Sequence, residues 1–368
     1  MKLSFFTMPI HPLGKPVAQC LREDREAFLL ADRLGYAEAY CGEHSTDLAE
    51  NITSTVAFLA SLAYETTQIR LGTGTVNLPN SHPVRVAAEV AMLDHMLEGR
   101  LNFGISPGGL MSDAEAFGSL DKDRNAMFLE CINMVLDIWA GEPPYDLSGQ
   151  FWNVSTGRTQ MAAIGQGSIM KPYQAPHPPI VGTAVAPFSK GVTAMAARGW
   201  EPISANFLLP KWVATHHPNY AQGCAEGGLA VNPYGWRVAR SIFVAEDSAT
   251  ARAYALDPNG PYVHYYRQIL TKMKKGGRTN LFKEDPTMSD DAVTLEYVVD
   301  KLVTYGSPVE VIDKLHEFRE VTGPFNHLVY AGHDWADPAL GRRSMELMAE
   351  RVVPELRTTV AASERASA

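Results

Sequence analysis

The sequence predicts a closed parallel α/β barrel of eight strands, the (β/α)8 or TIM barrel. Short apolar, β-branched or aromatic runs alternate with amphipathic helical segments along the 368 residues. This alternation is typical of a parallel sheet, because parallel strands must be joined by long crossover connections. Eight runs qualify as strands, which is the number that closes such a barrel. They cover residues 3–8, 37–42, 69–76, 101–106, 180–183, 201–206, 237–244 and 326–331.

Helix signals fill the intervals between these runs. In the first interval, Ala27, Leu30 and Leu34 fall on one helical stripe, and Gly35 follows them as a helix-ending glycine does. The expected helices cover residues 17–34, 53–64, 83–97, 124–140, 189–198, a segment around 210–225, 250–272, 309–321 and 341–353.

An open, doubly wound sheet is the competing architecture. A dinucleotide-binding sheet of that kind carries G-x-G-x-x-G directly after its first strand. Here the corresponding position reads Pro9-Ile10-His11-Pro12, which cannot cradle a pyrophosphate. The closed barrel is therefore the prediction.

We expect one domain over residues 1–357, with two irregular segments inside it. Residues 150–172 carry short β-like pieces rich in Gly and Thr, which predict an inserted hairpin. Residues 273–292 are polar, contain glycine and lack periodicity, which predicts a mobile lid loop. Residues 358–368 are expected to form a disordered tail.

Composition and charge exclude several classes of protein. The net charge of −9 argues against a nucleic acid or a membrane surface as partner, because both need clustered Lys and Arg. The four cysteines form no C-x-x-C pair, so neither a metal site nor a dithiol centre is expected. No apolar stretch reaches the ~18 residues of a membrane helix, and no signal peptide precedes the first strand. We expect a cytoplasmic protein.

Polar residues follow the predicted strands at their carboxyl ends, where barrels place their active sites. His44 follows the second strand, and a histidine there can act as acid, base or hydrogen-bond donor. A solvated loop histidine is the alternative. Gly74, Thr75 and Asn77 follow the third strand and Ser106 ends the fourth. Glycine there allows a flat ligand to approach the backbone, or it forms only a tight turn.

The helix start after the fifth strand predicts an anion site. Ser189 would cap this helix, whose free N–H groups can hold a phosphate, and Lys190 adds a positive charge. A phosphate bound after a late strand is common in barrels. A simple serine cap is the alternative. Taken together, the strand ends suggest a planar cofactor with a phosphate tail.

Several blocks of sequence resemble the bacterial-luciferase-like flavin-dependent monooxygenases over nearly the whole chain. They comprise the opening strand with Glu43-His44, residues 72–85 (GTGTVNLPNSHPVR), residues 93–105 (LDHMLEGRLNFGI) and residues 306–312 (GSPVEVI). The same blocks in the same order make the signal specific. Residues 333–338 (HDWADP) are similar to the single-chain, limonene-monooxygenase-like branch.

The resemblance implies a barrel that holds reduced FMN at its carboxyl-terminal mouth. It also implies a separate flavin reductase that supplies the FMN, and a homodimer. His44 matches the catalytic histidine, and the Gly74–Thr75 bond matches a cis peptide under the flavin ring. The cofactor-binding residues that the resemblance and the strand ends imply are Gly74, Thr75, Asn77, Ser106, Ser189, Lys190 and Gly191.

The sequence also departs from the luciferases at two positions. Ser45 stands where they have a second histidine, and Pro107 stands where they have an arginine. Lys190 or Arg124 can replace that charge. These departures argue against light emission and leave oxygenation as the expected reaction.

The expected function is that of a two-component monooxygenase that uses reduced FMN and O2, through a flavin hydroperoxide. It would oxygenate a small apolar organic substrate, a terpene, aldehyde or ketone. Two alternatives remain, a deazaflavin-dependent hydride-transfer oxidoreductase of the same superfamily and a non-catalytic flavin-binding or partner-binding barrel. The substrate pocket is expected to be lined by Phe207, Leu208, Leu209, Tyr262, Tyr265 and Tyr266.

Overall fold

Eight strands form the closed ring of a (β/α)8 barrel. The computed structural model describes residues 1–8 and 10–367, with side chains up to residue 360. The ring order is β10-β12-β1-β2-β3-β5-β8-β9, and β9 pairs again with β10. Each predicted strand is one strand of the ring, so the predicted fold is confirmed. The bounds are β1 (Lys2–Thr7), β2 (Glu38–Cys41), β3 (Arg70–Thr73), β5 (Leu101–Ser106), β8 (Ile180–Ala184), β9 (Glu201–Ser204), β10 (Arg237–Val244) and β12 (His327–Gly332).

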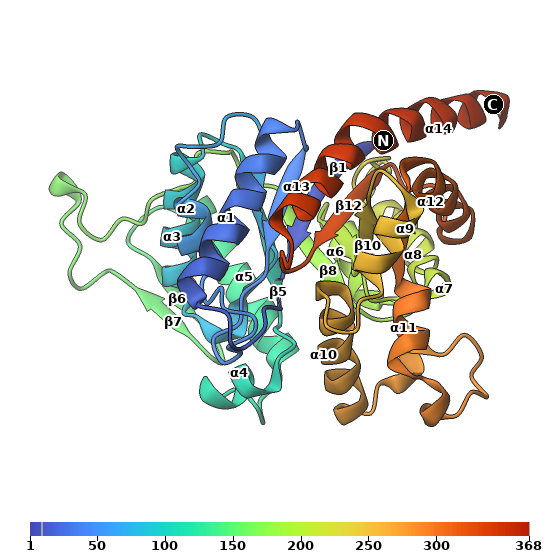
Figure 1. The fold of residues 1–368 in the computed structure, drawn as a ribbon. Coiled ribbons are helices and arrows are strands. Elements are labelled where there is room, and N and C mark those ends of the chain that lie inside the picture. Colours follow the sequence, from blue (N-terminus) through green and yellow to red (C-terminus); the bar gives the residue numbers. More distant parts are fainter. Residues whose placement is uncertain (9, 368) are drawn as a thin grey trace. The chain divides into compact units, whose positions relative to one another are not determined.

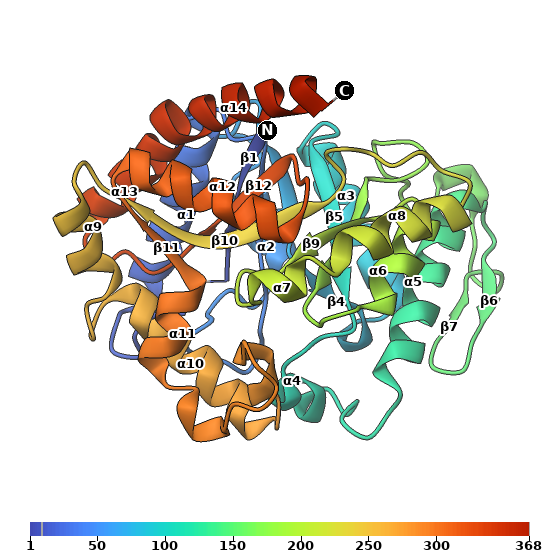
Figure 2. The ribbon, with the colours of Figure 1, turned by 90° about the vertical axis from the view of Figure 1, so that its right-hand side faces the viewer.

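Helices connect the strands along the chain (Figures 1 and 2). Two further short strands extend the sheet outside the ring: β4 (Val76–Asn77) pairs with β5, and β11 (Val303–Gly306) pairs with β10. Among the described residues, none of the helices combines the length and apolar character needed to cross a bilayer. The helices are α1 (Val17–Arg33), α2 (Thr55–Ala60), α3 (Pro83–Met96), α4 (Met111–Ala116), α5 (Arg124–Ala140), α6 (Lys190–Ala197), α7 (Pro210–Val213), α8 (His216–Glu226), α9 (Ser248–Ala255), α10 (Pro261–Lys275), α11 (Leu295–Leu302), α12 (Pro308–Thr322), α13 (Pro338–Leu347) and α14 (Val353–Ser367).

The residues of the predicted domain group into two compact units. Residues 1–39 and 182–368 form one unit, and residues 40–181 form the other. Both divisions fall inside strands, between residues 39 and 40 of β2 and between residues 181 and 182 of β8. No change of composition or linker marks such a division, so the sequence could not show it.

In the larger unit, β12 lies between β1 and β10 with parallel pairing on both sides. Lys2 is in register with His327 and Thr7 with Gly332, while Arg237 of β10 is also in register with His327. Every residue of β10 is buried. These three strands therefore make the continuous inner core on which the helices of this unit pack.

The smaller unit contains the predicted inserted hairpin. The antiparallel strands are β6 (Asp146–Ser148) and β7 (Asn153–Ser155), so the hairpin begins a few residues before the predicted insert at 150–172. An isolated antiparallel bridge joins Met161 to Gln166 further along. In Figure 1, the green segment that adjoins β6 and β7 extends away from the helices of this unit.

One helix prediction in the larger unit is corrected, and one helix of this unit was not predicted. The expected helix 250–272 is interrupted between α9 and α10, because Pro258, Gly260 and Pro261 interrupt the helical hydrogen bonding there. The sequence analysis also missed α11 and β11. The helix α11 is only eight residues long and continues directly into β11, so no helix-ending residue separates the two elements.

The segment expected to be a disordered tail is drawn out as the end of a helix. Residues 358–367 belong to α14, and Ala368 lies outside the described residues. Leu356 and Val360 are buried on one side of this helix, which gives it an apolar contact that fraying would lose. The predicted lid, residues 273–292, contains the end of α10 and two short 3₁₀ turns, and Leu281 and Phe282 are buried within it. Its mobility stays a prediction.

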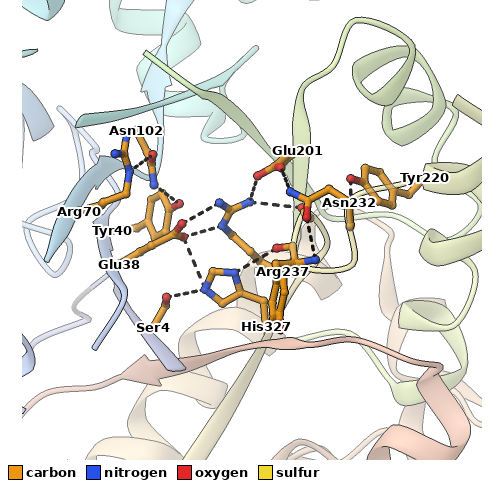
Figure 3. Close-up of polar contacts among 12 residues, drawn as sticks. Ser4, Glu38, Tyr40, Arg70, Asn102, Glu201, Tyr220, Asn232, Arg237 and His327 are labelled. Carbon is orange, nitrogen blue, oxygen red and sulfur yellow. Dashed lines mark hydrogen bonds and ion pairs between the residues drawn. The ribbon is translucent and has the colours of Figure 1, made fainter. Parts of the chain in front are cut away.

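A buried charge network joins the first residues of several strands in the larger unit (Figure 3). The Arg237 guanidinium donates to both carboxylate oxygens of Glu38, at 2.6 and 2.8 Å, and to Glu201 at 2.6 Å. His327 lies beside them, with Nε2 2.7 Å from Ser4 Oγ and Nδ1 3.2 Å from the backbone oxygen of Tyr234. Burial lowers the pKa of His327 to about 4, so its imidazole is neutral in the folded protein.

The Arg237–Glu38 pair makes a stability prediction. We expect Glu38→Gln to lower the free energy of unfolding by about 3 kcal/mol, because it leaves a buried guanidinium without its bidentate partner. Urea unfolding followed by circular dichroism measures this change. The matched control is Glu89→Gln, which breaks the exposed ion pair with Arg85 and should leave stability nearly unchanged. Equal effects of the two variants would contradict the assignment.

The neutral state of His327 makes a pH prediction. Its folded pKa lies below the ordinary value of 6.5, so the unfolded chain binds more protons between pH 6.5 and 4. Stability should therefore fall as the pH is lowered through that window. We expect His327→Gln to flatten this slope, measured as the free energy of unfolding at several pH values. The same change at the exposed His95 is the control and should keep the slope.

Candidate active site

The loop after β2 holds His44 between two buried carboxylates. Nδ1 of His44 lies 3.0 Å from an oxygen of Asp113, and Nε2 lies 3.1 Å from an oxygen of Glu50. The imidazole is 12% exposed, whereas both carboxylates are almost completely covered. A neutral imidazole has only one N–H, so the second contact needs a second proton, on His44 or on a carboxylate. The three groups can therefore hold and pass a proton.

Asp113, in α4, fixes the loop that carries His44. Its second oxygen accepts hydrogen bonds from the backbone N–H of Ser45 and of Thr46, at 3.1 and 2.9 Å, and from the Thr46 hydroxyl at 2.7 Å. The sequence analysis missed Asp113 and Glu50, because neither directly follows a strand and Asp113 lies 69 residues beyond His44. The acidic residues around His44 in sequence were the only available signal.

The neighbouring Glu43 ties the end of β2 to the end of β4. Its carboxylate accepts from the backbone N–H of Thr55 at 3.0 Å and of Asn77 at 3.1 Å, and the Asn77 amide donates to the Glu43 backbone oxygen at 3.2 Å. Burial raises the pKa of Glu43, and the hydrogen bonds from Thr55 and Asn77 oppose that rise. Asn77 thus holds the backbone directly before His44.

Three predicted cofactor residues form one hydrogen-bonded row. The Thr75 hydroxyl donates to Ser106 Oγ at 2.7 Å, and the Ser106 hydroxyl donates to the Asn77 side-chain oxygen at 2.8 Å. The backbone N–H of Gly108 also donates to Ser106 Oγ, at 3.1 Å. The Gly74–Thr75 peptide bond is cis, as the family resemblance implies. The row carries no charge, and Ser106 is its partly exposed member.

Close strand packing explains two of the glycines at these strand ends. A Cβ on Gly72 would lie 2.2 Å from the Tyr40 ring, and one on Gly104 would lie 1.8 Å from the backbone oxygen of Thr73. Neither position leaves room for a side chain. These glycines are therefore required by the barrel interior, independently of any ligand.

The predicted phosphate residues lie at the start of α6, in the larger unit. Ser189 is the N-cap residue, but its side chain makes no capping hydrogen bond, and its backbone oxygen accepts from the Asn219 amide at 3.0 Å. Lys190 and Gly191 are exposed. The simple serine cap is therefore wrong, and the first N–H groups of α6 have no side-chain cap. His44, Thr75, Asn77 and Ser106 belong to the smaller unit.

The predicted substrate-lining residues are mostly buried. Leu208 and Leu209 follow β9, and Tyr262, Tyr265 and Tyr266 lie on one face of α10. Phe207 is partly exposed. The tyrosines surround His333, a residue that the sequence analysis used only for the family resemblance. Its place directly after β12 was the signal that could have singled it out.

The arrangement suits proton transfer beside an uncharged planar ligand. Within the smaller unit, His44 supplies a titratable group and the Thr75–Ser106–Asn77 row supplies neutral hydroxyl and amide groups. Over the described residues, no group of three or more His, Cys, Asp or Glu side chains is arranged to hold a metal ion.

Comparison with known proteins places this geometry in a family. The profile of the luciferase-like monooxygenases matches residues 1–323. The chain is 30% identical to 4-hydroxyprotoasukamycin monooxygenase of Streptomyces nodosus subsp. asukaensis, over 96% of this chain and 92% of that protein. It is 26% identical to limonene 1,2-monooxygenase of Rhodococcus erythropolis, over 95% of this chain and 85% of that protein.

Solved structures show the same fold. The oxygenating constituent of 3,6-diketocamphane monooxygenase from Pseudomonas putida, a type II Baeyer–Villiger monooxygenase in complex with FMN, superimposes with a TM-score of 0.87 at 23% identity, covering 97% of this chain and 98% of that one. An F420-dependent secondary alcohol dehydrogenase superimposes with a TM-score of 0.66 at 16% identity, covering 96% and 98%. The match over residues 1–323 decides the family: this chain belongs to the luciferase-like monooxygenases.

Proposed function

We propose that the chain is the oxygenase of a two-component system that uses reduced FMN and O2 to oxygenate a small apolar organic substrate. The observation that supports this proposal is that two features of the smaller unit are joined by a hydrogen bond. His44 lies between Asp113 and Glu50, and the residue before it is hydrogen-bonded to Asn77 of the neutral row. A proton-handling group is thereby fixed to the surface that suits a flavin ring.

The described residues fit FMN in their chemistry. Gly74, Thr75, Asn77 and Ser106 offer backbone, hydroxyl and amide groups and no charge, which suits the uncharged part of the isoalloxazine. When bound, reduced FMN supplies the activation of O2. The protein supplies binding, orientation and control of protons.

The phosphate of FMN is assigned to the start of α6. Ser189 leaves the helix N-terminus without a side-chain cap, so the hydroxyl and the first N–H groups can turn to an anion. Lys190 is exposed and has no ion-pair partner among the described side chains. Gly191 keeps the approach to the helix start free of a side chain.

His44 is assigned the handling of the proton during oxygen transfer. Asp113 orients the imidazole through Nδ1, so Nε2 and its contact with Glu50 form the part that can change. Control of this proton decides whether oxygen reaches the substrate or is released as hydrogen peroxide.

The segment 273–292 is assigned the role of a lid that excludes water. Arg278 donates to the backbone oxygen of Val185 at 3.1 Å, and the Trp212 indole donates to the backbone oxygen of Leu281 at 2.9 Å. These contacts attach the segment to the loop after β8 and to α7. Single hydrogen bonds of this kind can open and close.

A flavin reductase as transient partner, a homodimer and a cytoplasmic location complete the proposal. The partner follows from the two-component scheme, and the name of the diketocamphane protein, an oxygenating constituent, supports it. Terpenes, aldehydes and ketones are the proposed substrate classes.

A deazaflavin-dependent hydride-transfer enzyme is the second candidate, because the F420-dependent dehydrogenase shares the fold. The two differ in their use of O2. Oxygen consumption that is coupled to product with reduced FMN supports the monooxygenase, whereas reduction of F420 by an alcohol supports the alternative. A non-catalytic barrel would do neither.

The role of His44 makes a coupling prediction. We expect His44→Ala to lower the yield of oxygenated product per O2 by at least tenfold and to raise hydrogen peroxide release in proportion, because the proton is no longer held. Product and peroxide are measured together after addition of reduced FMN. His95→Ala, a change at an exposed histidine of α3, is the control. Unchanged coupling in His44→Ala would defeat the assignment.

The role of Lys190 makes a binding prediction. We expect Lys190→Gln to weaken the binding of FMN several-fold and to leave the binding of riboflavin, which has no phosphate, unchanged. Flavin fluorescence titration measures both affinities. Rising salt should reduce the difference between the variant and the unmodified protein. Equal losses for FMN and riboflavin would place the phosphate elsewhere.

A further inference from the structure

His333 directly follows β12 and lies in an aromatic enclosure. Its ring meets Tyr262 and Tyr265 in edge-to-face contacts, with ring centroids 4.4 and 4.5 Å away and interplanar angles of 63° and 62°. Both tyrosines belong to α10 and are three residues apart, so they share one face of that helix. In a barrel, the residue directly after a strand is the one placed to meet a ligand.

One nitrogen of His333 belongs to a buried hydrogen-bond network. Nε2 lies 3.0 Å from Ser241 Oγ. Ser241 Oγ accepts from the Asn206 amide at 3.0 Å and lies 2.8 Å from the Tyr266 hydroxyl, and Tyr265 donates to Asn206 at 3.2 Å. The other four residues are buried, whereas His333 is partly exposed. The network therefore reaches accessible surface through His333.

The network determines which nitrogen of His333 carries the proton. The nearest acceptor of the Tyr266 hydroxyl is Ser241 Oγ, because the backbone oxygens of Asn206 and Leu302 are both 3.4 Å away. With Tyr266 as the donor in that shortest contact, Ser241 accepts two hydrogen bonds and its own proton is directed to Nε2 of His333. Burial keeps the imidazole neutral, since it lowers the pKa to about 3. A neutral imidazole that accepts at Nε2 carries its N–H at Nδ1.

This N–H has no acceptor in the protein. Nδ1 of His333 is buried and has no hydrogen-bond partner among the described residues. A buried donor without an acceptor destabilises the folded state, and such groups in native proteins call for an explanation. A ligand oxygen that accepts a hydrogen bond and brings no proton of its own, as a ketone or aldehyde oxygen does, would satisfy it.

We propose, as an extension of the proposed function, that His333 is a specificity-determining residue that donates from Nδ1 to the carbonyl oxygen of the substrate. The aromatic rings of Tyr262 and Tyr265 contact the apolar skeleton. The hydrogen bond positions the carbonyl and withdraws electron density from its carbon. Of the proposed substrate classes, ketones and aldehydes are therefore preferred over terpene hydrocarbons.

Binding of a matched pair of probes tests this inference. Camphor and bornane share one bicyclic skeleton, and only camphor carries a carbonyl oxygen. We expect the unmodified protein to bind camphor about tenfold more tightly than bornane. His333→Phe, which keeps an aromatic ring and removes both nitrogens, should reduce this ratio to within about twofold. His95→Phe, the same change at an exposed histidine of α3, is the control and should keep the ratio.

A spectroscopic measurement keeps the inference testable if His333→Phe does not fold. ¹⁵N NMR of the unmodified protein should show His333 protonated at Nδ1, with a downfield shift of that proton when camphor is added. Ser241→Ala removes the donor to Nε2, so the Nδ1–H form should lose its dominance and the camphor-to-bornane ratio should fall. An Nε2–H form in the unmodified protein, or no preference for camphor, would overturn the inference.

The outcomes also separate this inference from the proposed function. If the camphor preference depends on His333 but no O2-coupled product forms with reduced FMN, the proposed monooxygenase is wrong and the carbonyl subsite stands. If oxygenation proceeds and His333→Phe keeps the preference, Nδ1 of His333 makes only a contact with a tyrosine ring. In that case the proposed function stands and only this inference is wrong.

Discussion

The hydrogen bonds of Asn77 hold the end of β2 against the ends of β4 and β5. Through them, the backbone before His44 is attached to the neutral row of Thr75 and Ser106. If this link were lost, the imidazole would keep its carboxylate partners but lose its fixed distance from the row. The chemistry that we assign to the smaller unit requires both features at one place, so it depends on one amide side chain, one carboxylate and two backbone groups.

Buried charge serves two different purposes in this protein. In the Arg237 network every charge has close partners of opposite sign, and the neighbouring His327 is kept neutral by burial. That arrangement stabilises the first residues of the strands and leaves no group to react. Around His44, by contrast, two buried carboxylates contact the two nitrogens of one imidazole. Ionisable groups packed together in this way are typical of sites that handle protons.

We assign different roles to the two histidines that follow strands, because their surroundings differ. His44 lies between carboxylates and can exchange a proton. His333 lies among tyrosine rings, where burial keeps it neutral, so it can only donate a hydrogen bond. Under our two proposals, the same type of side chain transfers a proton in one place and recognises a neutral oxygen in the other, because its neighbours differ.

The sequence by itself determined the barrel, since alternating apolar runs and helical segments are local patterns that appear at each of the eight strands. It also identified Thr75, Asn77 and Ser106, because they stand at strand ends, and the family resemblance indicated the cis bond at Gly74. Only the tertiary structure showed that Asp113 and Glu50 contact His44, and that Ser241 Oγ lies 3.0 Å from Nε2 of His333. These partners are far apart in the chain and follow no periodic pattern. Their contacts arise from packing, which a reading of local spacing does not contain.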